Sequence, residues 1–580
     1  MSTLPIEVTR VTADVVVIGG GGAASRAALS ARQAGADVRL VAKAPLRIGG
    51  SSVHGASEIM SMGAAGFGDR RDSPAIHYED TMRAGEGFID PALVRVLAED
   101  APDRIRDLIA LGVPFDRAPD GEDYRLIRSD FGSFARALGV SGKTGRAVVE
   151  ALSDELVRRG VAVDAPVMLV DLIRNSDGSV AGALAYAPER RMLIHYEAPS
   201  VVLGTGGMHG AFERQVSTPE MTGDGQAICF RHGAELVNLE FHQFGPALIH
   251  PYVQLFSKSC FVLHPRITNG LGEEFLPRYV PVGVPLEEVY DEKVFPFTTE
   301  NVSRYIDVAI AREINEGRGT PNGCVNFSFA HVSAERIEAT IPNTARWMRE
   351  RGLDVRKGLF EVGIAFQCMN GGVRMVNAGA ESTIPGLFVI GELAGGVRGP
   401  DRPGGNSLAE GQVFGHRAGT AAADRAARER NRGGGLLQLA TDRVASVMGR
   451  PVADHELAAL VEKVRSAMQR HCLVEKSESG LRRALATVRD VRDALDVGCG
   501  ATPDTLSTVL SVRNLALASE LVLRACLHRH ETRSAHYRVD FPETDDSRFK
   551  HSLVLRREGE DGVAIREHAY ADMASTLSAV

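Results

Sequence analysis

The sequence predicts an α/β fold whose main domain is a discontinuous Rossmann-like unit. An apolar run at 14–18 leads into four glycines and a helix of small residues, the order expected of a buried parallel strand, a tight turn and a helix. A second strand-like run at 37–43 follows at the spacing of a βαβ unit. Two further strands that end in glycine lie far downstream, at 201–207 and 386–391. Together they outline one dinucleotide-binding domain whose pieces are separated by inserted segments.

The glycines at the first turn predict a dinucleotide pyrophosphate site. In the pattern Gly19-x-Gly21-x-x-Ala24, the first glycine makes the turn, the second lets backbone approach a pyrophosphate, and the small third residue lets helix pack on strand. The pyrophosphate would lie at the helix N-terminus. A glycine turn that binds nothing shows the same local pattern, but the later strands and the helix start at Asp224 favour the binding site. The second strand ends in Ala42, where a ribose-binding acid often stands.

Length and composition exclude several classes of protein. A chain of 580 residues is expected to hold more than one domain, and 44% hydrophobic with 24% charged residues is ordinary for a soluble globular protein. A formal charge of -8 argues against binding to nucleic acid or to an anionic membrane. No run approaches about 18 apolar residues, and the N-terminus lacks a basic region before an apolar core. We therefore expect a cytoplasmic protein without direct membrane insertion or a nucleic-acid partner.

Seven cysteines are scattered along the chain without any CxxC pair. That spacing predicts neither a disulfide framework nor an iron–sulfur or other metal site within this chain. We expect buried or partly buried free thiols at Cys229, Cys260, Cys324, Cys368, Cys472, Cys499 and Cys526.

Several longer segments match a known protein family. They include 14–24, 77–87, 307–319, 385–408 and 530–545. In these segments the chain resembles the flavoprotein subunit of succinate dehydrogenase and fumarate reductase, a family that includes L-aspartate oxidase and, more distantly, the flavoprotein subunit of adenylylsulfate reductase. Segment 530–545 is more specific than 77–87 and 307–319, and the resemblance runs from about residue 14 to about residue 551.

The resemblance implies that the cofactor is FAD. Glu392 matches the family's ligand to the FAD ribose, and the backbone of Ser407 and Leu408 would meet the flavin pyrimidine, where a helix N-terminus stabilises negative charge. The residues expected to contact FAD are Gly19, Gly20, Gly21, Gly22, Ala23, Ala24, Ala42, Lys43, Gly50, Ser51, Ser52, Gly55, Leu169, Thr205, Gly206, Asp224, Glu392, Asn406, Ser407 and Leu408.

The resemblance also implies how the flavin is attached. In the respiratory members a histidine shortly after the second strand is covalently linked to the flavin, and Ser51 stands at that position here. This is similar to aspartate oxidase and implies non-covalent FAD. His54, three residues further on, is the alternative linkage point. Because the covalent bond raises the flavin potential in this family, its absence disfavours succinate oxidation.

A domain order follows from the same resemblance. We expect an FAD-binding domain interrupted by an α+β capping domain that closes over the flavin, then a helical domain and a short tail. Apolar residues spaced three to four apart at 453–465 predict a helix in the helical domain. Alternating apolar residues at 551–556 predict a strand in the tail. The expected boundaries are 11–246 and 360–425 for the two parts of the FAD-binding domain, 247–359 for the capping domain, 426–540 for the helical domain and 541–580 for the tail.

The positions that hold a dicarboxylate in this family differ here at four of five sites. Gly245 and Gln367 replace two histidines. An ungapped count back from residue 272 places Ser257 and Lys258 at a Thr–Glu pair and Phe261 at a proton-donating arginine. Because phenylalanine cannot donate a proton, ordinary succinate dehydrogenase or fumarate reductase activity is not expected. The changes predict a roomier and partly apolar pocket.

Arg402, the one family position that is kept, is expected to anchor a substrate carboxylate. Lys258, His264 and Arg266 are the candidates for proton transfer or a second anion contact, although each by itself is more often structural or solvated than catalytic. We predict an FAD-dependent oxidoreductase in which hydride passes between flavin N5 and an organic acid other than succinate.

Two alternatives to this prediction stay open. One is a flavoprotein subunit that docks an iron–sulfur partner, as in adenylylsulfate reductase or fumarate reductase, so that any cluster belongs to another subunit. The other is an inactive flavin-binding scaffold, against which the presence of Arg402 and Glu392 argues. The electron acceptor would be oxygen, a quinone or the partner subunit.

Overall fold

The computed structural model describes residues 6–429, 436–449, 452–497, 500–559 and 562–570. At its centre lies a five-stranded parallel sheet in the order β19-β11-β2-β3-β7. The strands are β2 (Val15–Ile18), β3 (Val38–Val41), β7 (Ala162–Asp164), β11 (Ser200–Leu203) and β19 (Leu387–Val389). The side chains of β2, β3, β11 and β19 are almost all buried, as expected for a parallel sheet that is covered on both faces, whereas the edge strand β7 is partly exposed. The sheet confirms the predicted α/β class and the discontinuous Rossmann-like domain.

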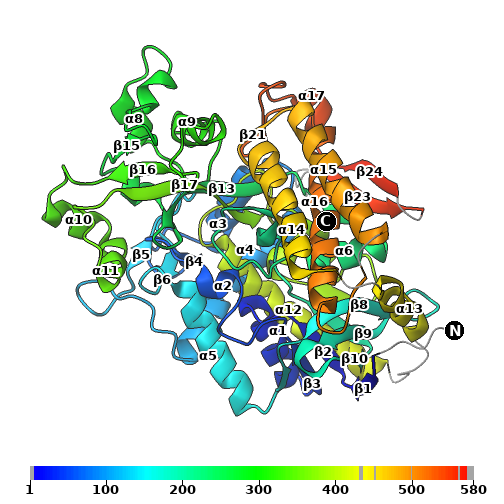
Figure 1. Ribbon diagram of the computed structural model, residues 1–580. Helices are drawn as coiled ribbons and strands as arrows, with labels where there is room; N and C mark the ends of the chain where they lie inside the picture. Colours follow the sequence, from blue (N-terminus) through cyan, green and yellow to red (C-terminus); the bar gives the residue numbers. More distant parts are fainter. Residues whose placement is uncertain (1–5, 430–435, 450–451, 498–499, 560–561, 571–580) are drawn as a thin grey trace.

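Two helices bring the separated halves of this domain together. Helix α1 (Gly22–Gln33) follows β2 directly, and α12 (Asn406–Arg428) follows the glycine stretch almost 400 residues later. They pack closely because α12 presents glycine to α1: a Cβ added at Gly419 would lie 2.2 Å from the carbonyl oxygen of Ala27. Figure 1 shows the two helices side by side next to the central sheet. The helix pair therefore fixes where the two predicted parts of the FAD site meet.

Smaller sheets and helices complete the FAD-binding domain. One antiparallel sheet with a parallel edge strand has the order β1-β10-β9-β8, and a three-stranded sheet has the order β4-β6-β5. Their strands are β1 (Val8–Thr12), β4 (Ser61–Gly63), β5 (Leu126–Ile127), β6 (Ala137–Gly139), β8 (Met168–Arg174), β9 (Val180–Ala187) and β10 (Met192–Glu197). The helices are α2 (Ser51–His54), α3 (Pro74–Gly85), α4 (Pro91–Ala110), α5 (Thr144–Arg158) and α6 (Asp224–Arg231).

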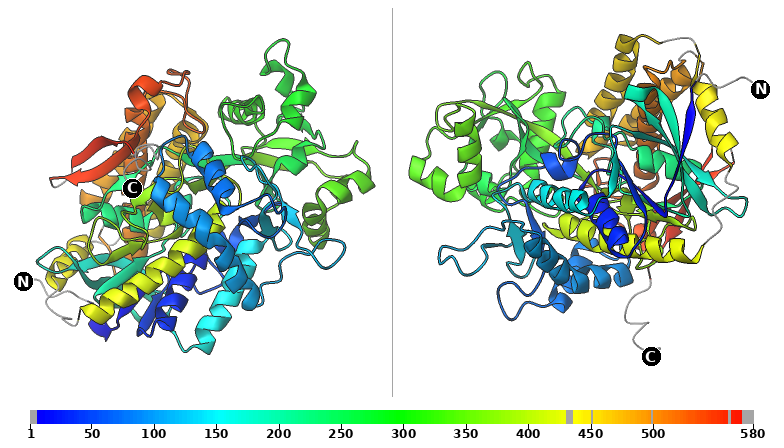
Figure 2. Two further views of the ribbon diagram at one scale, coloured as in Figure 1. Left: turned by 180° about the vertical axis from the view of Figure 1, so that it is seen from behind. Right: turned by 90° about the horizontal axis from the view of Figure 1, so that it is seen from below.

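The inserted segment forms a separate lobe, drawn in green in Figures 1 and 2. Its sheet, in the order β14-β13-β17-β16-β15, consists of β13 (His242–His250), β14 (Gln254–Leu255), β15 (Arg266–Thr268), β16 (Val325–Ser328) and β17 (Phe360–Met369). Its helices are α7 (Lys258–Phe261), α8 (Leu286–Asp291), α9 (Arg304–Asn315), α10 (Ala334–Thr340) and α11 (Pro342–Glu350). This is the α+β capping lobe. Strands β13 and β17 pair over most of their length and connect the lobe to the FAD-binding domain.

The C-terminal part is helical, as predicted, and its last strands return to the FAD-binding domain. Helices α13 (Leu437–Val447), α14 (Asp454–Met468), α15 (Glu478–Val497) and α16 (Leu506–His528) are followed by the short helix α17 (Asp546–Phe549), with a two-stranded pair β21 (Glu475–Lys476) and β22 (Tyr537–Arg538). The expected strand at 551–556 is β23 (Ser552–Glu558). It pairs with β24 (Gly562–His568) and with β12 (Leu236–Val237), in a sheet completed by β18 (Gly372–Arg374) and β20 (Ala394–Gly395).

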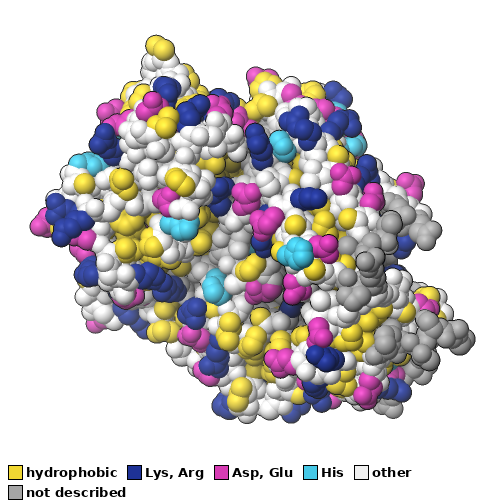
Figure 3. Space-filling model, viewed as in Figure 1, with side chains coloured by type: hydrophobic (Ala, Val, Ile, Leu, Met, Phe, Trp, Pro, Cys, Tyr) yellow, Lys and Arg dark blue, Asp and Glu magenta, His cyan; other side chains and the backbone are white. Residues whose placement is uncertain are grey.

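Helix α16 is, within the described residues, the one helix long and apolar enough to cross a membrane. However, 78% of its apolar window is buried inside the protein, which is typical of a core helix. On the face shown in Figure 3, acidic and basic side chains are interspersed and no broad field of one charge is seen.

Candidate active site

A large cavity lies where the two halves of the FAD-binding domain meet the capping lobe. At its centre Gly19 turns the chain between β2 and α1 with a φ of +137°, and a Cβ there would lie 2.2 Å from the carbonyl oxygen of Gly204. Only glycine fits both constraints. Of the residues expected to contact FAD, all line this cavity except Ala24 and Asn406.

Ala24 and Asn406 support the cavity from behind. A Cβ added at Gly19 or Gly204 would lie 3.1–3.2 Å from the Ala24 methyl, so Ala24 holds helix against strand. Asn406 Oδ1 accepts a hydrogen bond from His77 Nε2 at 2.9 Å, and Asn406 Nδ2 donates to Thr81 Oγ1 at 2.9 Å. Its side chain fixes the start of α12 on α3.

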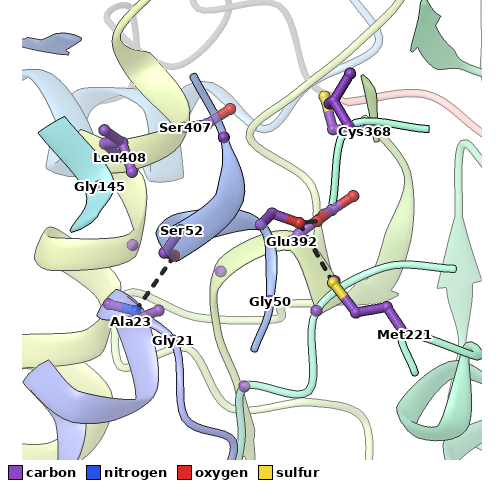
Figure 4. A pocket seen from close by; sticks show the side chains of 18 of the residues that line it. Gly21, Ala23, Gly50, Ser52, Gly145, Met221, Cys368, Glu392, Ser407 and Leu408 are labelled. Atoms are coloured by element: carbon purple, nitrogen blue, oxygen red, sulfur yellow. Dashed lines mark hydrogen bonds between the residues drawn. The ribbon is translucent and has the colours of Figure 1, made fainter. Parts of the chain in front are cut away.

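The end of the cavity at α1 is built for a phosphate-bearing ligand. The hydroxyl of Ser52 accepts a hydrogen bond from Gly22 N at 3.3 Å, as Figure 4 shows. Lys43 Nζ contacts Asp224 Oδ2 at 2.9 Å and also donates to Thr222 and Ser511 at 2.9 and 2.8 Å. This lysine is therefore held by the protein, and it positions Asp224 at the rim of the cavity.

Buried polar atoms without a protein partner support the fit of FAD. The hydroxyls of Thr205 and Ser407 line the cavity, are buried and have no hydrogen-bond partner in the described structure. Buried polar groups are nearly always paired, so a polar ligand is expected to satisfy them. The N-termini of α1 and α12 also meet at the cavity, and both favour negative charge.

Glu392 and Ser51 lie near one another on the opposite wall. The Glu392 carboxylate accepts a hydrogen bond from Met369 N at 3.0 Å and lies 3.4 Å from the Ser51 hydroxyl. That hydroxyl also lies 3.4 Å from the sulfur of Met221. In Figure 4, Glu392 and Met221 face the same side of the pocket. His54, the alternative linkage residue, is exposed and lies outside the residues that line the cavity.

Arg402 lies at the other end of the cavity with an unused donor. It is 7% exposed, and its Nη2 donates to the amide oxygen of Gln243 at 2.7 Å. The Nε of Arg402 and the Nε2 of the fully buried Gln243 have no partner in the described structure. Cys368 completes this corner, with its sulfur 3.5 Å from the same amide oxygen. Arg402 lines the cavity whereas Gln243 does not, so the unpaired Nε of Arg402 is the donor available to an anionic oxygen.

Arg398, the second arginine on the cavity wall, is held by backbone carbonyls and by an ion pair. Its Nη atoms donate to backbone carbonyls at 2.7–3.0 Å, and its Nε faces Glu410 at 2.9 Å. Both side chains are 2% exposed. Burial raises the pKa of Glu410 to about 7 against the opposing charge of Arg398. This buried pair holds the start of α12 and leaves Arg402 as the arginine available to a substrate.

The wall formed by the capping lobe is apolar, and the expected extra room at Gly245 is absent. A Cβ at Gly245 would lie 2.2 Å from the ring of Phe295, which lines the cavity and occupies that space. Phe295 packs with Leu255 in a small cluster of buried apolar residues. The prediction of a partly apolar pocket therefore agrees with the structure, whereas the prediction of a roomier one was wrong at this position.

The residues proposed for proton transfer do not line the cavity. Arg266 is exposed and pairs with Glu274 at 2.6 Å. His264 contacts Asp291 at 2.7 Å and stacks on a tyrosine ring at the outer side of the capping lobe. Lys258 begins α7 and is half-buried.

Phe261 likewise lies away from the cavity. It is fully buried and packs edge-on against Phe327, with ring centroids 5.9 Å apart. The ungapped count therefore does not identify a residue of the pocket, and the absence of an arginine at 261 has no bearing on proton transfer there.

Several cavity residues were missed by sequence reasoning, and two of them lie at the end near Arg402. Asp130 and Phe295 reach the cavity from irregular segments, between β5 and β6 and between α8 and α9. Neither segment has a periodic pattern or a motif that would single these residues out. Their place follows from tertiary packing alone.

A nucleotide-binding Rossmann-like domain, a capping lobe and a cavity that joins them define an FAD-dependent oxidoreductase. Residues 14–408 match the family model for the FAD binding domain, and residues 461–576 match the model for the fumarate reductase flavoprotein C-terminal region. The chain belongs to the succinate dehydrogenase and fumarate reductase flavoprotein family.

Individual relatives agree with this assignment. The chain is 34% identical over 565 residues to a subunit of the fumarate reductase (CoM/CoB) of Methanothermobacter marburgensis, covering 94% of this chain and 97% of that protein. It is 31% identical to L-aspartate oxidase of Caulobacter vibrioides, covering 91% and 94%. The solved structure of Mycobacterium smegmatis Sdh1 in complex with UQ1 superposes with a TM-score of 0.82 at 29% identity, covering 97% and 95% of the two chains.

Proposed function

We propose that the protein transfers hydride between non-covalently bound FAD and a small organic acid other than succinate, whose carboxylate is held by Arg402. The observation that supports this proposal is the buried corner at Arg402, which lines the cavity and whose Nε lacks a partner among the described residues. A carboxylate would accept from this donor and neutralise the buried guanidinium. An inactive scaffold would have no need of such a corner.

FAD, when bound, supplies a hydride acceptor or donor at its isoalloxazine ring. The chain positions it: Gly19 and Gly21 admit the pyrophosphate, Glu392 would accept from a ribose hydroxyl, and the N-terminus of α12 at Ser407 stabilises negative charge on the pyrimidine. The apolar wall at Phe295 excludes water from the same end of the cavity.

The distribution of charge favours an acid with one carboxylate beside a less polar part. In the lining of the cavity, Arg398 is engaged by carbonyls and Glu410, which leaves Arg402 for substrate. Fumarate and aspartate, the substrates that the relatives' names indicate, have two carboxylates. A second carboxylate here would face Asp130 and Phe295.

An anaerobic screen tests this function. Organic acids are added to the holoprotein without oxygen, and bleaching of the flavin absorption band is recorded. We expect acids with one carboxylate next to an apolar chain to bleach the band and succinate to leave it unchanged. Bleaching by succinate at the rate of a true family dehydrogenase would contradict the proposed substrate class.

A second candidate is a flavoprotein subunit that passes electrons to an iron–sulfur partner. The M. marburgensis relative is named as one subunit of its enzyme, which supports an assembly. Purification from the native source distinguishes the two: broad visible absorption from a co-purifying cluster subunit supports the partner, and a bare flavin spectrum supports the single-chain enzyme. In both cases we propose that the protein acts in the cytoplasm.

A further inference from the structure

Asp130 lies at the same end of the cavity as Arg402. The residue before it, Ser129, packs on the glycine loop that follows Arg402, since a Cβ added at Gly404 would lie 2.9 Å from the Ser129 Cβ. Asp130 itself lines the cavity, and its Oδ2 accepts a hydrogen bond from Phe295 N at 3.3 Å. One carboxyl group therefore stands between the arginine corner and the apolar wall.

No cation pairs with this carboxyl group. In the described part of the chain, no Lys, Arg or His nitrogen lies within 4.0 Å of it. The charges that act on it are Lys258, at the start of α7, and Lys293, which is buried and already paired with Asp307 at 2.7 Å. Burial raises the pKa of Asp130, and the two lysines act in the opposite direction. The group can therefore be protonated when the cavity is closed to water and can lose that proton to a neighbour.

Several other titratable groups on the cavity wall are occupied or badly placed. Lys43 and Asp224 hold each other at the far end. Glu392 accepts from Met369 N. Burial raises the pKa of the Cys368 thiol, which makes it a poor partner for proton exchange with water.

We propose that Asp130 is the residue that transfers a proton to and from the substrate carbon. In the direction of reduction, the Asp130 O–H bond breaks and a C–H bond forms on the carbon next to the one that receives hydride from the reduced flavin. The Asp130 carboxylate that remains then regains a proton from solvent. In the direction of oxidation the same carboxylate removes the proton. This inference rests on the proposed function.

The first test uses Asp130→Asn and Asp130→Glu with an acid that bleaches the wild-type flavin. General acid–base help is worth about 100- to 10,000-fold, so we expect kcat of Asp130→Asn to fall by that factor with little change in KM, and Asp130→Glu to recover part of it. Glu287→Gln, which changes an exposed carboxyl group on α8 of the capping lobe, is the control and should match the wild type.

The second test does not depend on turnover. Infrared difference spectra of the holoprotein between low and high pH should contain the stretch of a protonated carboxyl group that Asp130→Asn removes and Glu287→Gln keeps. Lys258→Met removes a positive charge that lowers the pKa of Asp130, so this pKa should rise. The infrared titration and the pH at which reduction slows should both shift to higher pH.

Each outcome decides the inference. Unchanged kcat in Asp130→Asn overturns it while the proposed function stands. A raised KM with unchanged kcat shows that Asp130 only binds substrate, for example an ammonium group, and also overturns it. If no organic acid bleaches the wild-type flavin, the proposed function fails and the inference falls with it.

Discussion

Substrate binding is expected to depend most directly on Arg402, through its guanidinium group. We expect Arg402→Ala to lower kcat/KM by roughly 30- to 5,000-fold, about 2–5 kcal/mol, because it leaves a substrate anion unpaired in a buried site. Arg402→Lys should not restore activity, since lysine cannot make two parallel hydrogen bonds to a carboxylate. Both variants are assayed in saturating FAD. If Arg402 only braces the glycine loop, they will instead bind FAD weakly and turn over normally once it is supplied.

Ser51 determines whether the flavin is bound covalently or non-covalently. Its hydroxyl lies 3.4 Å from Glu392 and offers no imidazole to link to the flavin, and His54 is exposed outside the cavity lining. We expect acid precipitation to release yellow FAD into the supernatant. Flavin that stays with the pellet would show a covalent link and would contradict this placement of His54.

Glu410 should make the stability of the protein depend on pH. Its pKa is raised from 4.5 to about 7 by burial, so the folded state binds this proton more tightly than the unfolded state does. The resulting stabilisation is fully present below pH 4.5 and is lost as pH rises towards 7, a change on the order of 3 kcal/mol. Glu410→Gln should flatten the dependence of the unfolding midpoint on pH over this range. Glu429→Gln, near the exposed end of the same helix, should leave it unchanged.

At the scale of elements, the contact between α1 and α12 joins the two halves of the FAD site. Gly419→Val would place a Cβ 2.2 Å from the carbonyl oxygen of Ala27, and overpacking of this kind costs about 1–3 kcal/mol. We expect a lower thermal midpoint together with a weaker affinity for FAD. Asp424→Ala, exposed on the same helix, is the matched control. An unchanged FAD affinity in Gly419→Val would show that the helix pair does not set the geometry of the site.

The elements with strong local patterns could be predicted from the sequence. The runs at 14–18 and 37–43 contain β2 and β3, and the apolar spacing at 453–465 lies in α14. Buried parallel strands and amphipathic helices produce these patterns by themselves, and the glycine turn between β2 and α1 is fixed by backbone geometry.

The end of the cavity where substrate would bind could not be predicted in the same way. The positions of Lys258 and Phe261 were counted across the capping lobe, where nothing in the local sequence fixes the register. Asp130 and Phe295 reach the cavity only because two loops converge in space. Gly245 indicated an opening, but a side chain 50 residues later in the chain fills it.

At the scale of the whole molecule, FAD should act as a structural bridge. The cavity is lined by residues from 18 to 412, so a ligand bound there contacts both halves of the domain and the capping lobe. Binding to the folded state alone stabilises by about 2.7 kcal/mol at a ligand concentration 100 times Kd. We expect the thermal midpoint of the stripped protein to rise as FAD is added, and to be unaffected by adenosine monophosphate at the same concentration, which spans only one half of the site. An FAD-independent midpoint would show that the two halves are already locked together.

The strand order of the central sheet also affects how the protein folds during synthesis. Strand β11 pairs with β2 on one side, but its other neighbour, β19, follows only after residues 204–386 have been made. At about 5–20 residues per second, that interval lasts roughly 10–40 s. Throughout it, the buried edge of Val201, Val202 and Leu203 is open, and such an edge is a template for association with other chains. The strands of the capping lobe, which end with β17 at Met369, are synthesised within the same interval. We therefore expect the nascent protein to present a folded lobe beside an unfinished sheet, the stage at which a chaperone would be needed most.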